Sequence, residues 1–215
     1  MATRGRSRSA HRRVILAALA AVASLGLAAC GEDGPSTTPA ATDRPAATAA
    51  PAATSSSTFP PCTFSGTTDP AEGGADALPK LLTDVRVGIH DCYERVTFEF
   101  KPQRGEPDGP VGWKAAYDPG PITEDGSGHP VPIKGTAFLV VRLTGSGADL
   151  SQEAAPATYT GPPSLEAAGA TRIEQVRRTG DFEGVITWVI GVDGQRPFSV
   201  STQDNPTRLI VDVGD

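Results

Sequence analysis

Apolar and polar residues alternate along much of the second half of the chain. In residues 82–89 and 93–100 nearly every second side chain is apolar, and charged or small side chains lie between them. A period of two is typical of β-strands that bury one face. Only the three residues His90–Cys92 separate the two segments. We therefore expect an antiparallel hairpin.

Six more segments have the length and apolar content of strands, and turn-forming Gly, Pro, Asp and Asn residues separate them. They are residues 112–117, 137–143, 172–178, 185–192, 198–202 and 208–213. Residues 76–83 and 164–168 are expected to form short helical turns. The pattern predicts an all-β domain of about eight short strands, either a β-sandwich or a barrel.

The start of the chain has a different pattern. Residues 1–13 contain five arginines and no acid, and residues 14–29 are uncharged and almost entirely apolar. A basic segment followed by a short apolar one is typical of a secretory signal peptide, and the apolar run is short for a permanent membrane-spanning helix. We expect residues 1–29 to be a signal peptide. Arg12-Arg13 leaves both the general and the twin-arginine export routes open.

The apolar run ends in Leu27-Ala28-Ala29-Cys30, which resembles the lipobox of bacterial lipoproteins. In that family the cysteine thiol receives a diacylglyceryl group, and cleavage occurs just before it. The resemblance implies lipid attachment at Cys30 and a location at the extracytoplasmic face of the cell membrane, since two acyl chains give stable anchoring. The alternative is an ordinary signal peptide with a chance cysteine.

Residues 31–60 consist mainly of Ala, Thr, Ser and Pro, with almost no large apolar side chain before Phe59. Such a segment cannot bury enough surface to offset the entropy lost on ordering. We expect residues 30–60 to form a lipidated, disordered tether and residues 61–78 a pre-domain segment. Residues 79–215 are then the folded domain, which is long enough for one hydrophobic core.

The charge balance narrows the choice of partners. The whole chain has 19 basic and 25 acidic residues, and removal of residues 1–29 would take away five arginines and no acid. The mature protein is therefore more acidic than its precursor. An acidic protein repels nucleic acid and anionic lipid headgroups. We expect no nucleic-acid partner, and membrane attachment through the lipid alone.

The cysteine count predicts one disulfide. Once Cys30 is lipidated, Cys62 and Cys92 are the only thiols left. A pair of thiols in an exported protein usually oxidises. A bond between Cys62 and Cys92 would pin the end of the tether to the domain. The alternative is two free thiols.

The sequence offers little for catalysis. Only His90 and His129 follow the signal peptide, and no Gly-x-Ser-x-Gly motif is present. A zinc site needs three or four ligands that converge, and a nucleophile needs a base within reach. We expect no metal, no cofactor and no enzymatic activity, with His90 in the hairpin connection and His129 in a loop.

Three residues are candidates for ligand binding. Trp113 is equally compatible with stacking on a sugar ring and with a place in the core, whereas Trp188, in a segment apolar on both faces, is expected in the core. Arg95 and Arg208 are candidates for binding carboxylates of peptide stems or anionic wall polymers. The alternative for these arginines is a cross-strand ion pair with Asp212 or Glu99.

The segments that contain these arginines share one form, Arg-apolar-x-apolar-acid-apolar, in residues 95–100 and 208–213. Either amphipathic strands simply look alike, or the two segments occupy equivalent places in the two halves of a sandwich. In both cases alternation places Arg95 and Arg208 on an outer face, with Val96, Phe98 and Leu209 toward the core.

The whole folded part resembles the AMIN-like domain of bacterial lipoproteins, a relative of the AMIN domain of cell-wall amidases and secretins. The segments that carry this resemblance are residues 82–91, 93–100, 125–131, 159–162, 180–185, 197–200 and 206–213. The resemblance implies a two-sheet sandwich and a non-catalytic role in the cell envelope. Peptidoglycan is the ligand it favours. The alternatives are a scaffold that binds an envelope protein and, third, an envelope hydrolase.

Overall fold

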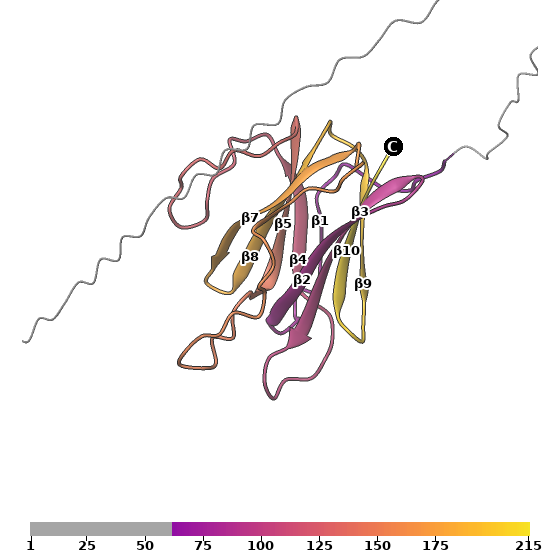
Figure 1. Ribbon diagram of the computed structural model, residues 1–215. Coiled ribbons are helices and arrows are strands. Elements are labelled where there is room, and N and C mark those ends of the chain that lie inside the picture. The colour runs from indigo at the N-terminus through magenta and orange to yellow at the C-terminus, as the bar shows by residue number, and fades with distance from the viewer. Residues whose placement is uncertain (1–61) are drawn as a thin grey trace, which may run out of the picture. The chain divides into compact units, whose positions relative to one another are not determined.

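The computed structural model describes residues 62–215, which form ten β-strands and no helix (Figure 1). The all-β class is confirmed. The strands are β1 (Ala71–Gly73), β2 (Lys80–Ile89), β3 (Tyr93–Pro102), β4 (Trp113–Asp118), β5 (Ala137–Ser146), β6 (Ser164–Leu165), β7 (Ile173–Phe182), β8 (Val185–Val192), β9 (Phe198–Gln203) and β10 (Arg208–Gly214). The predicted signal peptide, Cys30 and the tether lie outside the described residues.

The strands form two antiparallel groups. Sheet A has the order β2-β3-β10-β9, and sheet B has the order β1-β4-β5-β8-β7-β6. A short parallel pairing of Lys80 and Leu81 in β2 with Gly145 and Ser146 in β5 joins them into one mixed sheet. Gly145 permits this junction, because a Cβ atom there would collide with the Lys80 carbonyl oxygen.

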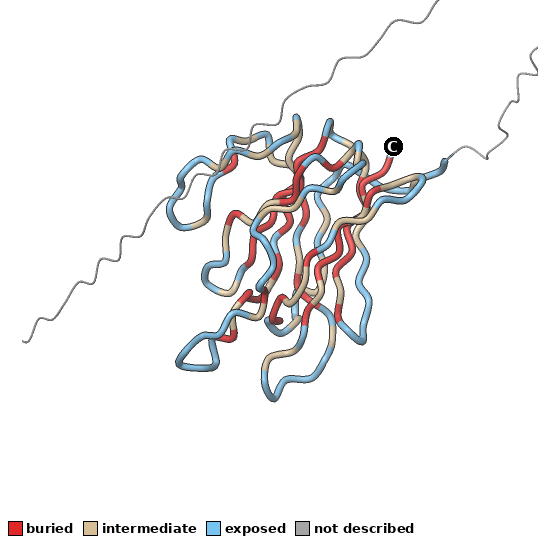
Figure 2. Tube along the Cα trace, in the orientation of Figure 1, coloured by how far each residue is buried: buried red, intermediate tan, exposed pale blue. Residues whose placement is uncertain are grey.

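The hydrophobic core lies between the two sheets. Each sheet turns alternate side chains inward, as the period of two predicts, and Figure 2 shows the buried positions along the middle of the strands. Phe98 of sheet A and Trp188 of sheet B meet there with ring centroids 6.0 Å apart, and both side chains are fully buried. The core place expected for Trp188 is therefore confirmed.

All eight predicted strands are present, and two further short strands were not predicted. Residues 164–168 do not form a helical turn, because Ser164 and Leu165 pair with β7 as β6. Residues 76–83 do not form one either, because β2 already begins at Lys80. β1 contains only three residues, Ala71–Gly73, and is held by pairing with β4 rather than by an apolar pattern of its own.

A long loop between β4 and β5 covers part of the outer face of sheet B. Its residues Ile122, Val131 and Ile133 pack on Val140 and Val189, which point away from the main core. This second small cluster explains why β5 and β8 are apolar on both faces. Among residues 62–215 no helix is long and apolar enough to cross a membrane.

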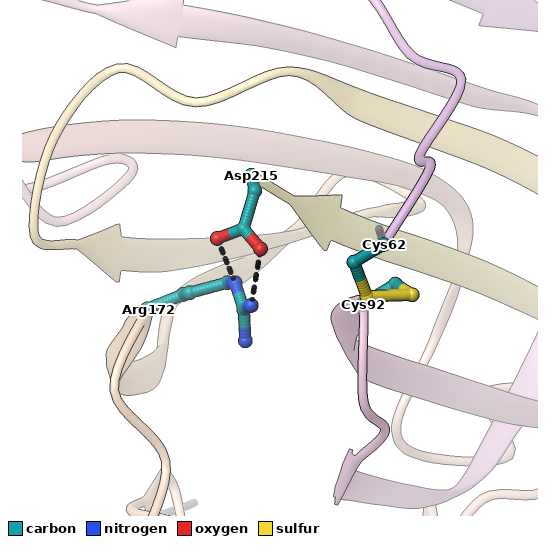
Figure 3. Close-up of a disulfide and its surroundings, with 4 residues drawn as sticks. All are labelled: Cys62, Cys92, Arg172 and Asp215. Carbon is teal, nitrogen blue, oxygen red and sulfur yellow. Dashed lines mark hydrogen bonds and ion pairs between the residues drawn. A yellow bond between two sulfur atoms is a disulfide. The ribbon is translucent and has the colours of Figure 1, made fainter. Parts of the chain in front are cut away.

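The predicted disulfide between Cys62 and Cys92 is present, with the two Cα atoms 5.2 Å apart (Figure 3). It fastens the first described residues to the connection between β2 and β3. Beside it, the Phe64 ring lies 6.1 Å from the ring of Tyr93. Thr67 then exchanges two backbone hydrogen bonds with Phe198. The segment before residue 79 is thus attached to the sandwich at several points.

Candidate functional site

The outer face of sheet A carries paired charges. β3 and β10 are antiparallel neighbours, with Arg95 directly opposite Asp212 and Arg208 directly opposite Glu99. The Arg95 guanidinium donates two hydrogen bonds to the Asp212 carboxylate, at 2.7 and 2.8 Å. Arg208 donates one to Glu99 at 2.8 Å. The cross-strand ion pairs that the sequence left as the alternative are therefore present.

This pairing explains the motif shared by residues 95–100 and 208–213. The two segments do not occupy equivalent places in two halves, as one hypothesis proposed, but lie side by side in one sheet. An antiparallel pair places the first residue of one motif opposite the fifth residue of the other. In this pairing the arginine of each motif therefore lies opposite the acid of the other.

Further contacts hold the charged side chains on this face. Arg86 donates hydrogen bonds to Asp84 at 2.7 Å and to Glu99 at 3.4 Å. The Arg95 guanidinium lies 5.1 Å from the centroid of the Tyr93 ring. Its bonds to Asp212 raise the pKa of Arg95. A ligand that bound Arg95 or Arg208 would have to open these pairs first.

Trp113 lies in the other sheet and does not form one site with the two arginines. Its cross-strand partner in β5 is Leu143, whose side chain faces the core. The partly buried Trp113 indole packs against the same core cluster. Gly73 of β1 lies opposite, and a Cβ atom there would be 2.8 Å from the indole Nε1. The indole therefore packs on the core side of sheet B, as the core interpretation of Trp113 expected.

The outer face of sheet B has an open hollow of about 550 Å³ beside Thr144 of β5 and Val185 of β8. Thr144 and Val185 face one another there across β5 and β8, and the backbones of Gly74 and Gly112 complete the floor. Gly112 is required for the close approach of β4 to β5, since a Cβ atom would lie 2.6 Å from the Thr144 Oγ1.

Two cations lie side by side in this hollow. Lys114 of β4 is directly opposite Arg142 of β5, and both line the hollow. Lys114 forms an exposed ion pair with Glu72 at 2.8 Å, which lowers the pKa of the Glu72 carboxyl. Within residues 62–215, Arg142 makes neither an ion pair nor a side-chain hydrogen bond to the protein. Like charges directly opposite one another destabilise a sheet, and Glu72, which also lines the hollow, offsets the charge of Lys114 but not that of Arg142.

The sequence analysis did not identify Arg142 or Lys114. A signal was available, because Arg142 is the one charged residue within the predicted strand 137–143. Its juxtaposition with Lys114 was not predictable, since it depends on the register between β4 and β5.

Glu94 is a buried acid that the sequence analysis also missed. It is 1% exposed and points inward at one end of β3. Its carboxylate accepts backbone hydrogen bonds from Thr171 and Ile173, each at 2.6 Å, and from Arg172 at 3.1 Å. Arg172 is also held by Asp215, as Figure 3 shows. Glu94 thus ties sheet A to the start of β7, and its acceptor sites are occupied by the protein.

A second hollow, also of about 550 Å³, lies beside the hairpin of β7 and β8. Arg177 and Asp181 are among its lining residues, and the exposed side chains of Leu150 and Phe182 lie at it. The two hollows have different lining residues, and they come near each other at the hairpin, where Val185 lines the one that contains Arg142 and its cross-strand partner Phe182 lines the other.

No group of three or more His, Cys, Asp or Glu side chains within residues 62–215 is arranged to hold a metal ion. His90 lies in the connection between β2 and β3, where its ring stacks on Tyr93 at 4.5 Å. His129 is exposed in the loop between β4 and β5.

The AMIN-like domain family matches residues 80–215, which is most of the sandwich. The chain therefore belongs to the AMIN-like domain family. No curated protein and no solved structure matches it significantly. At the level of the family, membership indicates a binding domain that acts on the cell envelope.

Proposed function

We propose that this protein is an exported lipoprotein, anchored through Cys30 at the outer side of the cell membrane, whose AMIN-like domain binds peptidoglycan without hydrolysing it. The charged and apolar zones of residues 1–30 support export and lipidation. The disulfide between Cys62 and Cys92 fits an oxidising compartment. Family membership supports an envelope ligand.

The binding site in this proposal is the hollow that contains Lys114 and Arg142. The observation that carries it is their direct juxtaposition in a chain with a net charge of −6. The Arg142 guanidinium has no partner within residues 62–215, and a planar guanidinium suits a carboxylate, which it can bind with two parallel hydrogen bonds. Peptide stems of peptidoglycan present carboxylates along with neutral sugars. Trp113 and Glu72 also line this hollow, so the indole lies beside the two cations. Arg95 and Arg208 are weaker candidates, because acids of the protein itself already bind their guanidinium groups.

Retention on purified, protein-free cell wall tests this function. The full-length chain, extracted from membranes in detergent, should sediment with the wall, and added salt should weaken retention because exposed charges are screened. Replacing Arg142 with Gln should reduce the affinity roughly tenfold, the effect of one charged hydrogen bond. Arg208→Gln is the matched control on sheet A and should leave retention unchanged. Equal losses for the two variants would contradict the assignment of the site.

Lipidation has its own test. Cys30→Ala should move the protein from the membrane fraction to a soluble or uncleaved pool, because no acyl chain would then hold it. A Cys30→Ala protein with unchanged fractionation and gel mobility would contradict anchoring at this residue.

The alternative is a scaffold that binds another envelope protein. It is favoured by the exposed apolar side chains near the β7–β8 hairpin, where Leu150 is 67% and Phe182 is 54% exposed. The same sedimentation experiment separates the two functions. Retention on bare wall supports a glycan or peptide-stem ligand, whereas retention only after addition of membrane extract supports a protein partner.

A further inference from the structure

The free edge of sheet A is the strand β9, which has a neighbour on one side only. It pairs with β10 over its whole length in a regular register, and Figure 1 shows it as the outermost strand beside β10. On its other side, Thr67 is the one described residue that forms a β-bridge with it, at Phe198. The remainder of that edge is exposed from Ser201 to Gln203.

The backbone groups that point out of this edge can be identified from the hydrogen bonds. Phe198 exchanges both of its backbone hydrogen bonds with Thr67, at 2.8 and 3.0 Å, so its N–H and C=O point away from β10. In an antiparallel sheet this direction alternates along the strand. Val200 and Thr202 therefore also direct their N–H and C=O groups outward. Within residues 62–215, no other residue forms a hydrogen bond with these four outward groups.

Edge strands normally carry a device that prevents pairing with other strands, such as a lysine, a proline, an inward charge or a bulge. β9 consists of Phe-Ser-Val-Ser-Thr-Gln and has none of these devices. The side chains that it turns to the outer face, Ser199, Ser201 and Gln203, are neutral. A second strand would therefore meet no charge repulsion along this edge.

From these observations we infer that β9 is a self-association edge, where two copies of this chain pair through their β9 strands in antiparallel orientation. The free groups are symmetric about Ser201, so Val200 of one copy lies opposite Thr202 of the other, and the reverse. All four outward groups of each strand are then satisfied, and the two A sheets become continuous.

The ends of the edge favour a second copy over a longer peptide. Thr67 blocks any partner strand that extends past Ser199 toward Phe198. In the symmetric register, the partner residue opposite Ser199 is Gln203, which is the last residue of β9. The partner strand therefore ends and turns back where Thr67 begins. An unrelated extended peptide has no reason to stop at this point.

Cysteine cross-linking tests the proposed register. Ser201 would lie on the twofold axis in a non-hydrogen-bonded pair, where Cα atoms are about 4.5 Å apart and a disulfide can form. The Ser199 residues of the two copies would be roughly 14 Å apart, since four residues of strand separate them. Ser199→Cys is therefore the matched control, with the same strand, outer face and side chain.

In membranes from cells that express the full-length chain, mild oxidation of Ser201→Cys should yield roughly tenfold more covalent dimer than Ser199→Cys, as the difference in geometry requires.

Adding Thr202→Pro to the Ser201→Cys protein should abolish the dimer. The Thr202 N–H points outward, so the proline removes no hydrogen bond to β10. An unchanged unfolding midpoint would show that this variant folds. Equal cross-linking of the Ser199 and Ser201 variants, or no dimer from Ser201→Cys, would overturn the proposal. Neither result would bear on wall binding through Arg142.

Discussion

The outer faces of the two sheets differ in the charges that lie opposite one another across neighbouring strands. On sheet A, Arg95 lies opposite Asp212 and Arg208 lies opposite Glu99, so each cation meets an anion. On sheet B, Lys114 lies opposite Arg142, so a cation meets a cation. The first arrangement contributes to stability, whereas the second lowers it. The difference makes Arg142 the stronger candidate for contacting a ligand, because within residues 62–215 no acid pairs with its guanidinium.

The largest expected effect concerns the core that both faces share. Phe98 lies in β3 of sheet A, where its ring packs against Trp188 of sheet B, and both side chains are fully buried. Phe98→Ala should lower the free energy of unfolding by about 3–5 kcal/mol, because it removes a buried ring and leaves a cavity. Denaturant titration measures this loss. A loss of less than about 1 kcal/mol would mean that the inner face of β3 has been misassigned.

Charge reversal at Arg142 sharpens the comparison most directly. Arg142→Glu places an acid opposite Lys114 and so makes this part of sheet B resemble sheet A. We expect stability to rise by about 0.2–1 kcal/mol, because repulsion becomes attraction. Wall retention should fall at least roughly tenfold, since the anion-binding group is lost. Paired measurements of unfolding and sedimentation on one protein sample check both signs, and a fall in both quantities would indicate a structural role for Arg142 instead.

On sheet A, loss of an arginine should lower stability and leave wall retention unchanged, the opposite of the result expected for Arg142→Glu. Arg95→Gln should cost about 1 kcal/mol of stability, because the Asp212 carboxylate keeps its partly buried place without its partner. Wall retention should not change. A double-mutant cycle with Asp212→Asn measures the pair itself. A coupling energy near zero would show that the pair contributes nothing, and reduced retention would restore Arg95 as a candidate ligand residue.

The smallest effect is expected at Glu72, which is exposed and pairs with Lys114. The lowered pKa of Glu72 means that any stabilising contribution of the pair is present above its ordinary pKa and is lost as the pH falls through the lowered value. Glu72→Gln should leave the unfolding midpoint unchanged at neutral pH, because an exposed pair is screened by solvent. Wall retention should increase slightly, because Lys114 is released. Weaker retention would indicate that Glu72 itself contacts the ligand.

Much of the fold could be predicted from local pattern. Alternation in residues 82–89 and 93–100 was enough to place β2, β3 and their hairpin, because burial of one face requires a period of two. It also placed Phe98 and Leu209 inside and Arg95 and Arg208 outside. β1 and β6 could not be predicted, since three and two residues are too few to show a period and depend on their neighbours for pairing.

The sequence by itself determined which residues form the eight longer strands and which side of each is apolar, and it favoured a bond between Cys62 and Cys92. These properties depend on composition, spacing and the number of thiols. Only the tertiary structure decided which strands are neighbours. The register of β10 with β3 joins residues more than a hundred positions apart and pairs opposite charges, whereas the register of β4 with β5 brings Lys114 and Arg142 together. Register follows from packing over the whole core, so the candidate site emerges only once both sheets are assembled.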